Sequence, residues 1–213
     1  MVGAIVFDLD GTLVAGDAFG GFLTRSLRRN PLRVLALALT APLWGSVRLR
    51  RGGRARAELL LITSITFGRS PSALQRTFEE FAADHVRRGR IEVALERLVL
   101  HVRAGDEVVV ATACAQPLAR AVCRELGLGD VLLVASPFRH RRWAPPVAVA
   151  IRGELKVQAL RRAGIRLPVA HAYSDDARDL PLLRQAQHAH LVRPRARDEA
   201  RVRAELGDVE VLR

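Results

Sequence analysis

A short apolar run that ends in two carboxylates constrains this chain more than any other feature. It occupies residues 4–12, with the sequence AIVFDLDGT. The β-branched and aromatic residues predict a buried strand, and the polar residues after them predict a turn. In open α/β sheets, ligands bind outside the carboxyl ends of the strands. We therefore expect Asp8 and Asp10 to leave the sheet where a substrate enters.

Two acids and a glycine at this position suit phosphoryl transfer. One carboxylate can attack phosphorus and form an aspartyl-phosphate, and a second carboxyl can protonate the leaving oxygen and later deprotonate water. Gly11 permits a sharp turn that lets backbone amides face a phosphate. The competing interpretation is a solvated exit from a strand, because Asp and Gly are common turn residues.

The composition describes a globular protein. The chain has 213 residues, 49% of them hydrophobic and 26% charged, which suits one sizeable domain or a core with an insertion. The first strand begins at residue 4, so no removable signal peptide is expected. Cys114 and Cys123 lack the spacing of a metal or disulfide scaffold, and the 6 histidines show no metal-ligand spacing. These features favour a cytoplasmic location.

The net charge of +12 predicts an anionic partner. Between residues 25 and 56 there are nine arginines and no acidic residue. A nucleic acid is not the expected partner, because aromatic residues make up only 5% of the chain and no nucleic-acid-binding motif is present. Lys156 is the only lysine of the chain, and a compact ammonium suits a single phosphate oxygen.

Residues 34–47 form a stretch without a charged side chain, interrupted by Pro42 and flanked by arginines. A membrane-spanning helix needs about 20 apolar residues, so this stretch is too short to span. Two interpretations stay open. The stretch lies in the headgroup region of an anionic membrane, or it is a helical hairpin buried inside a lid.

The remaining pattern predicts a three-layer α/β/α, Rossmann-like core with a parallel sheet and an inserted all-helical cap. Asp17 and Ser70 are expected to begin two helices of the cap. Further strands are expected at 108–111, 131–134, 169–173 and 189–192, with helices at 91–105, from 117, at 154–162 and at 195–206. A basic, proline-containing segment, 138–151, is expected to form a hairpin on the sheet edge. The expected core comprises residues 1–15 and 90–213, and the expected cap comprises residues 16–89.

Polar side chains suited to one reaction follow several of these strands. Thr112 ends the second strand, Asp175 and Asp179 follow a later one, and Lys156 lies in the helix between them. Mg²⁺ prefers hard oxygen ligands and commonly takes one or two carboxylates, so Asp8, Asp175 and a backbone carbonyl at Asp10 would satisfy it. The metal, Lys156 and Thr112 would then neutralise the phosphoryl oxygens. The alternative for Asp175 and Asp179 is helix N-capping.

The order and spacing of these residues resemble the motifs of the haloacid dehalogenase superfamily. The matching positions are Asp8-Leu9-Asp10-Gly11-Thr12, Thr112, Lys156, and Asp175 with Asp179. The resemblance implies that Asp8 is the nucleophile and Asp10 the acid and base, and that Thr112 and Lys156 bind phosphate. It also implies an Mg²⁺ ion held by Asp8, Asp10 and Asp175 with support from Asp179, Gly11 and Thr12. The helical insertion resembles the phosphoserine-phosphatase-like branch, whose caps close over small phosphate esters.

A narrower resemblance is to the bacterial phosphatidylglycerophosphatase C family. It is carried by residues 17–23, 28–32, 66–68 and 174–188 together with the apolar stretch, while Asp176 and the basic segment 138–152 depart from that family's pattern. This resemblance implies hydrolysis of phosphatidylglycerophosphate to phosphatidylglycerol on the inner face of the cell membrane. Two alternatives stay open: a soluble phosphatase for a small phosphate monoester, and, more remotely, a basic nucleic-acid-binding protein.

Overall fold

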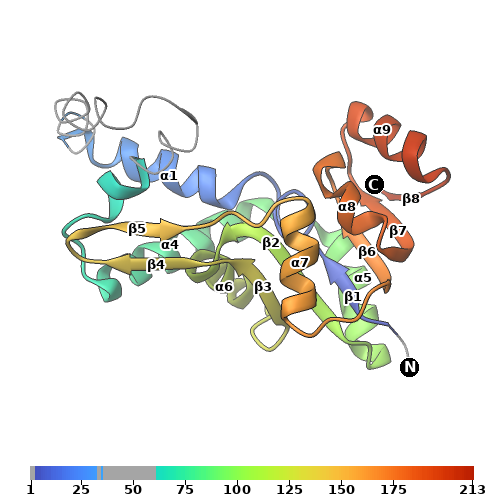
Figure 1. Cartoon of the computed structure of the whole chain (residues 1–213). Coiled ribbons are helices and arrows are strands. Elements are labelled where there is room, and N and C mark those ends of the chain that lie inside the picture. The colour runs from blue at the N-terminus through green and yellow to red at the C-terminus, as the bar shows by residue number, and fades with distance from the viewer. Residues whose placement is uncertain (1–2, 33–34, 36–60) are drawn as a thin grey trace, which may run out of the picture.

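The computed structural model describes residues 3–32, 35 and 61–213 of the chain, and it is built on a parallel sheet of six strands (Figure 1). The strand order is β3-β2-β1-β6-β7-β8. The strands are β1 (Ile5–Phe7), β2 (Val108–Ala115), β3 (Leu132–Ser136), β6 (Val169–Ser174), β7 (Ala186–Val192) and β8 (Glu210–Leu212). The central strand β1 is fully buried, and its residue Ile5 pairs with Val108 on one side and His171 on the other. The expected parallel sheet is confirmed.

Helices cover both faces of this sheet. They are α5 (Glu92–Ala104) and α6 (Gln116–Glu125) on one face, and α7 (Glu154–Arg162), α8 (Leu180–Leu183) and α9 (Ala196–Leu206) on the other. Successive side chains of β1 point to opposite faces of the sheet. Ile5 and Phe7 therefore join the apolar cluster of α5 and α6, while Val6 joins that of α7 and α8. The structure is therefore the three-layer α/β/α fold that the sequence predicts.

A helical insertion lies between β1 and α5. It contains α1 (Ala18–Arg28), a helical segment at residues 61–66 and α4 (Pro71–Gly89). Both expected N-caps are present, since Asp17 accepts a hydrogen bond from the amide of Gly20 and Ser70 from the amide of Ala73. The expected apolar stretch, residues 34–47, lies outside the described residues except for residue 35.

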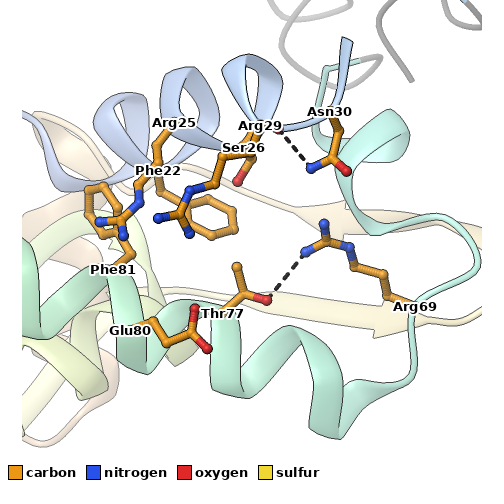
Figure 2. Close-up of a pocket in the computed structure, with 9 residues that line it drawn as sticks. All are labelled: Phe22, Arg25, Ser26, Arg29, Asn30, Arg69, Thr77, Glu80 and Phe81. Carbon is orange, nitrogen blue, oxygen red and sulfur yellow. Dashed lines mark hydrogen bonds between the residues drawn. The ribbon is translucent and has the colours of Figure 1, made fainter. Parts of the chain in front are cut away.

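The insertion shares its apolar core with the sheet. Phe22 of α1 contacts Phe78 and Phe81 of α4, with ring centroids 4.7 and 5.8 Å apart, respectively. Figure 2 shows Phe22 beside Phe81. These rings belong to the same buried cluster as Leu98 of α5 and Leu118 of α6. Removing the insertion would therefore expose apolar surface on the α5 and α6 layer.

The hairpin after β3 lies elsewhere than expected. Strands β4 (Phe138–Arg141) and β5 (Ala144–Ala148) form a separate antiparallel sheet rather than an edge of the main one. The hairpin instead contacts the insertion: the amide of Gly68 donates to the carbonyl of Arg142 at 2.7 Å, and His140 hydrogen-bonds the carbonyl of Arg69 at 3.0 Å. The edge prediction was wrong because these contacts with residues 68–69 join segments some 70 positions apart.

Two further strand predictions need correction. β2 continues to Ala115, four residues past the expected end, and β7 already begins at Ala186. β8 follows the last expected element, so β7 is not the final strand. Its three residues are too few to show a periodic pattern in the sequence. Among the described residues, no helix is long and apolar enough to cross a membrane.

Candidate active site

The carboxyl ends of β1, β2 and β6 open into a cleft of about 540 Å³. Most residues expected from the sequence line it, namely Asp8, Asp10, Gly11, Thr112, Lys156, Asp175 and Asp179. Thr12 is the exception: it is buried outside the lining, and its hydroxyl has no hydrogen-bond partner among the described residues. The chain thus brings together side chains up to 171 positions apart, from Asp8 to Asp179.

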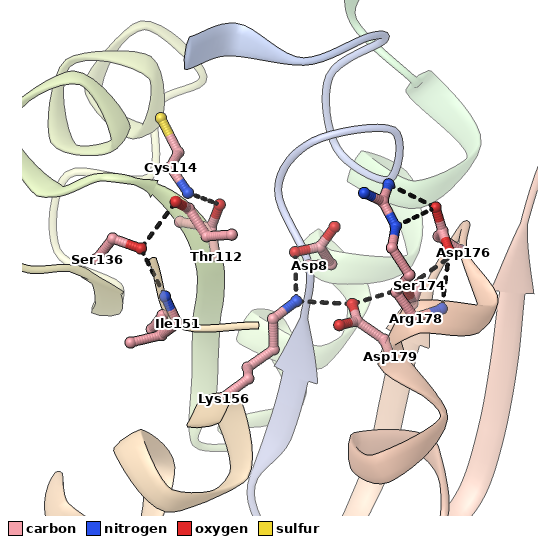
Figure 3. A network of polar contacts seen from close by, with 11 residues as sticks. Asp8, Thr112, Cys114, Ser136, Ile151, Lys156, Ser174, Asp176, Arg178 and Asp179 are labelled. Atoms are coloured by element: carbon pink, nitrogen blue, oxygen red, sulfur yellow. Dashed lines mark hydrogen bonds and ion pairs between the residues drawn. The ribbon is translucent and has the colours of Figure 1, made fainter. Parts of the chain in front are cut away.

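Lys156 connects two of these carboxylates. From the first turn of α7, its Nζ donates to Asp8 Oδ1 at 2.8 Å and to Asp179 Oδ2 at 2.6 Å (Figure 3). The side chain is only 3% exposed. Burial disfavours the charged ammonium, but the two carboxylates outweigh it and raise the pKa of Lys156 above its usual value. The lysine is therefore a permanently positive group at the base of the cleft.

Asp179 is held in place to receive that ammonium. Its Oδ2 also accepts a hydrogen bond from Ser174 Oγ at 2.9 Å, and it makes no side-chain cap to α8. The N-capping alternative thus fails for Asp179. Asp176 instead caps the short 3₁₀ helix Ala177–Asp179, because its side chain accepts a hydrogen bond from the amide of Arg178 at 2.7 Å. Sequence reasoning missed the role of Ser174, the last residue of β6. Its five-residue separation from Asp179 was the available signal.

Asp10 ties the cleft to the insertion. Its Oδ1 accepts a hydrogen bond from the amide of Ala18 at 2.9 Å, the first residue of α1. Burial raises the pKa of Asp10 to about 7, although the hydrogen bond from Ala18 opposes the shift. A carboxyl group with a pKa near neutrality can both donate and accept a proton, which is what acid and base catalysis needs.

Asp8 and Asp175 are the other two carboxyl groups of the expected metal site. Burial raises the pKa of Asp8 to about 8, with Asp179 adding to the shift and Lys156 opposing it. Burial and the neighbouring Asp176 raise the pKa of Asp175 to about 6. Both carboxylates are thus costly to ionise in the protein alone, and a bound cation would favour their charged forms.

Gly11 makes room for Asp175. Its φ of +84° lies in the left-handed region, and a Cβ built there would lie 2.2 Å from Asp175 Oδ2. Only a glycine therefore allows the carboxylate to approach the turn after β1 this closely.

The donor set fits Mg²⁺. Carboxylate oxygens of Asp8, Asp10 and Asp175 face one cleft, and hard oxygens are the ligands this ion prefers. Among the described residues, no three His, Cys, Asp or Glu side chains converge tightly enough to hold a metal by themselves. Mg²⁺ commonly binds one or two carboxylates and completes its shell with water and substrate phosphate.

Thr112 contributes a hydroxyl from β2. The side chain is buried at the cleft, and its Oγ1 accepts a hydrogen bond from the amide of Cys114 at 3.0 Å. The register of β2 against β3 shifts between Thr112 and Ala115, which brings that amide back toward the hydroxyl. Since a lone pair is already engaged, the hydroxyl proton can donate to an oxygen in the cleft.

Arg178 neutralises the acid that departs from the narrower family's pattern. It forms an ion pair with Asp176 at 2.6 Å, and its side chain also donates through Nε at 2.8 Å. Burial opposes ionisation of Asp176, yet the hydrogen bonds from Arg178 lower its pKa below the usual value. Asp176 is therefore held ionised by Arg178, and its charge still raises the pKa of Asp175.

The insertion and two arginines complete the walls. Phe19 and Leu23 of α1 face the cleft, as does Leu61. Arg152 and Arg195 also line the cleft, and both are exposed. Sequence reasoning missed these arginines as cleft residues, although Arg152 ends the basic segment noted above.

Fold and cleft together define a three-layer α/β/α protein whose candidate active site lies at the carboxyl edge of a parallel sheet. The family model for haloacid dehalogenase-like hydrolases matches residues 5–184, and the chain belongs to that family. The expectations of an enzyme and of this superfamily are confirmed.

Two relatives from Mycobacterium tuberculosis are similar in sequence. A probable phosphatase is 32% identical over 116 residues, which is 52% of this chain and 40% of that protein. A phosphoserine phosphatase is 29% identical over 212 residues, which is 92% of this chain and 67% of that protein. The chain thus spans less than half of the first relative and about two thirds of the second.

Solved structures show the same fold. A protein of unknown function from Bordetella pertussis Tohama I superposes with a TM-score of 0.71 at 23% identity, covering 100% of this chain and 99% of that chain. A substrate-bound phosphoserine phosphatase superposes with a TM-score of 0.60 at 14% identity, covering 100% and 94%. The fold is that of the phosphoserine-phosphatase-like branch.

Proposed function

We propose that this protein is a Mg²⁺-dependent phosphatase that hydrolyses a phosphate monoester through an aspartyl-phosphate on Asp8. The observation that carries the proposal is the buried ammonium of Lys156, 2.8 Å from Asp8 Oδ1 and within the same cleft as Asp10 and Thr112. A carboxylate next to a fixed positive charge, at the mouth of a parallel sheet, is arranged for attack on an anionic ester.

The two aspartates have separate tasks in this proposal. Asp8 attacks phosphorus, so the P–O bond to the leaving alcohol breaks as the bond to the carboxylate oxygen forms. Asp10, whose carboxyl is held by the amide of Ala18, gives its proton to the leaving oxygen. It then takes a proton from the water that hydrolyses the acyl-phosphate, which returns both groups to their starting state.

Lys156 and Thr112 bind the phosphoryl oxygens during both steps. Asp179 and Ser174 act through Lys156, because they keep its ammonium fixed. Asp8, Asp175 and the backbone carbonyl of Asp10 would hold a Mg²⁺ ion, which would supply positive charge to the phosphoryl group. We also propose residues 16–89 as the cap over the core of residues 1–15 and 90–213, since Ala18, the first residue of α1, donates its backbone N–H to Asp10.

A small phosphate monoester is the first candidate substrate. Its support is the likeness in sequence and fold to phosphoserine phosphatases. The described cap wall of the cleft is mostly apolar, with Phe19 and Leu23, so the alcohol that leaves would pack an apolar part against it.

Phosphatidylglycerophosphate at the inner face of a membrane is the second candidate. It is favoured by the tip of the β4–β5 hairpin, where Trp143 is 66% exposed and the guanidinium of Arg142 lies 4.9 Å from its ring centroid. Phe67, 48% exposed, contacts the same ring. An exposed aromatic pair beside arginines is typical of surfaces that bind anionic lipid headgroups.

A phosphate-release assay tests the proposal and separates its substrates. The purified protein with Mg²⁺ is given phosphoserine, phosphatidic acid and phosphatidylglycerophosphate in parallel. Release is expected from at least one of them, with none by Asp8→Asn and normal release by Asp208→Asn, which changes a fully exposed aspartate. Activity that survives Asp8→Asn would refute the mechanism, and the preferred ester decides between a small metabolite and a lipid.

A further inference from the structure

A second cavity, outside the cleft, lies between α1 and α4 of the insertion and has a volume of about 170 Å³. Its floor is apolar, formed by the buried rings of Phe22 and Phe81. Its walls carry three guanidinium groups, those of Arg25, Arg29 and Arg69 (Figure 2). Arg25 and Arg29 belong to the acid-free arginine cluster of residues 25–56, to which the proposed catalytic mechanism assigns no role.

The three arginines approach the cavity from two directions. Arg29 is the C-cap residue of α1 and lies four residues after Arg25, so both side chains lie on one side of the helix and extend toward α4 (Figure 2). Arg69 comes from the loop before α4, and its Nη1 donates to Thr77 Oγ1 at 3.3 Å. Three donor groups thus converge from both walls on one space, as recognition of a multi-oxygen anion requires.

The lining of the cavity carries more positive than negative charge. Arg25 forms an ion pair with Asp84 at 2.7 Å, while Arg29 forms none among the residues that the structure describes. Glu80 is the single acid of the lining, against three arginines. The apolar floor reduces solvent screening, so an additional anion would interact more strongly here than on an open surface.

We infer that this cavity binds a phosphate-type anion, either free phosphate or the phosphate of a lipid headgroup. The guanidinium fork matches the geometry of phosphate oxygens, and the cavity volume exceeds that of one such group. The site is separate from the cleft, because α1 turns Phe19 and Leu23 toward the cleft and Phe22 and Arg25 toward the cavity. The inference therefore does not rest on the proposed catalytic function.

Titration with inorganic phosphate, followed by NMR of the full chain, tests the site locally. Amide and arginine Nε–H signals of residues 22–29 and 77–81 report on the cavity, while amide signals of residues 8–12 report on the cleft. Arg29→Gln is expected to weaken phosphate binding at the cavity signals about tenfold. Glu80→Gln is expected to strengthen it, because that change removes the repelling carboxylate. A loss of folding cannot produce opposite effects in the two variants.

Arg28→Gln is the matched control. It removes the same charge from the neighbouring position of α1, where the side chain is exposed and outside the lining, so binding at the cavity should change little. Equal weakening by Arg28→Gln and Arg29→Gln would overturn the inference, since it would indicate a diffuse charge effect. So would cavity signals that stay unmoved at phosphate concentrations that saturate the cleft signals.

Vesicle binding identifies the source of the phosphate group. Phosphatidylcholine vesicles with and without phosphatidylglycerol are pelleted with each variant. A lipid headgroup in the cavity predicts that Arg29→Gln, and not Arg28→Gln, lowers co-sedimentation with the phosphatidylglycerol vesicles. Free phosphate as the ligand predicts equal sedimentation of the two variants together with the NMR difference between them.

Discussion

The cleft and the α1–α4 cavity have opposite charge balances within one strongly basic chain. Seven aspartates line the cleft against three arginines and one lysine, whereas three arginines line the cavity against one glutamate. The cleft therefore calls for a cation before it can hold a phosphate, and the cavity can hold an anion directly. The net charge of +12 describes neither site.

The two sites also use different basic residues for a physical reason. Lys156 is 3% exposed and fits between Asp8 and Asp179, which a compact ammonium with three donors can reach together. Arg25 and Arg29 lie at the edge of a more open space, where a broad planar fork suits several oxygens of one ligand. The difference predicts that the cleft depends on exact pairing and that the cavity tolerates substitution.

Lys156→Met should show the largest difference between the cleft and the cavity. It leaves Asp8 and Asp179 buried without their countercharge, so we expect a loss of about 3 kcal/mol in the free energy of unfolding and a loss of measurable turnover. Arg29→Gln, by contrast, should change the free energy of unfolding by less than about 0.5 kcal/mol. Urea denaturation of both variants measures the difference. Equal stability of the two would contradict the account.

Asp179→Asn tests whether that residue acts by positioning Lys156. The amide keeps the volume and can still accept from Ser174 Oγ, but it removes one of the two charges that hold the ammonium. We expect kcat to fall about 10- to 100-fold with little change in KM. Steady-state kinetics provide the test, and a change confined to KM would instead assign Asp179 to substrate binding.

Gly11→Ala should weaken Mg²⁺ binding through Asp175. The new Cβ would collide with Asp175 Oδ2 in addition to straining a backbone at φ +84°. Gly16→Ala is the matched control, because Gly16 has φ +82° and nothing within 4 Å of its Cβ position. Calorimetric Mg²⁺ titration should show a weaker affinity for Gly11→Ala alone. The same loss in both variants would attribute it to backbone strain.

Lowering the pH should reduce the stability of the folded protein through His171 of β6, and this is the smallest expected effect. Burial and the neighbouring His190 lower the pKa of His171 to about 4, and its Nδ1 lies 2.8 Å from His190 Nε2. The unfolded chain takes up this proton below about pH 6.5, while the folded protein resists until about pH 4, so stability falls across that interval. Urea midpoints at several pH values should fall less steeply for His171→Gln than for the wild type. The same pH dependence of the urea midpoint in both proteins would show that His171 does not cause the loss of stability.

Much of the cleft could be predicted from the sequence because topology brings strand ends together. Asp8 and Asp175 each follow a buried strand and Thr112 lies in the second half of β2, and parallel strands place such positions at one edge. Lys156 was identified by its rarity in the composition. These signals lie in the local sequence, so the residues can be identified without knowledge of side-chain packing.

The cavity and the histidine contacts could not be predicted in this way. The cavity depends on how α1 and α4 face each other, and Arg69 enters it from a loop whose position is set by the β4–β5 hairpin. His171 and His190 become neighbours only through the pairing of β6 with β7. Contacts of this kind come from side-chain packing between distant segments, which spacing along the chain does not reveal.

Trapping the covalent intermediate tests the central claim most directly. The wild-type enzyme is mixed with Mg²⁺ and its best substrate, quenched in acid during turnover, digested and analysed by mass spectrometry. The account predicts one phosphoryl group on Asp8, and none on the Asp8→Asn protein treated in the same way. A phosphoryl group on another residue, or rapid turnover with no phosphorylated protein, would contradict it.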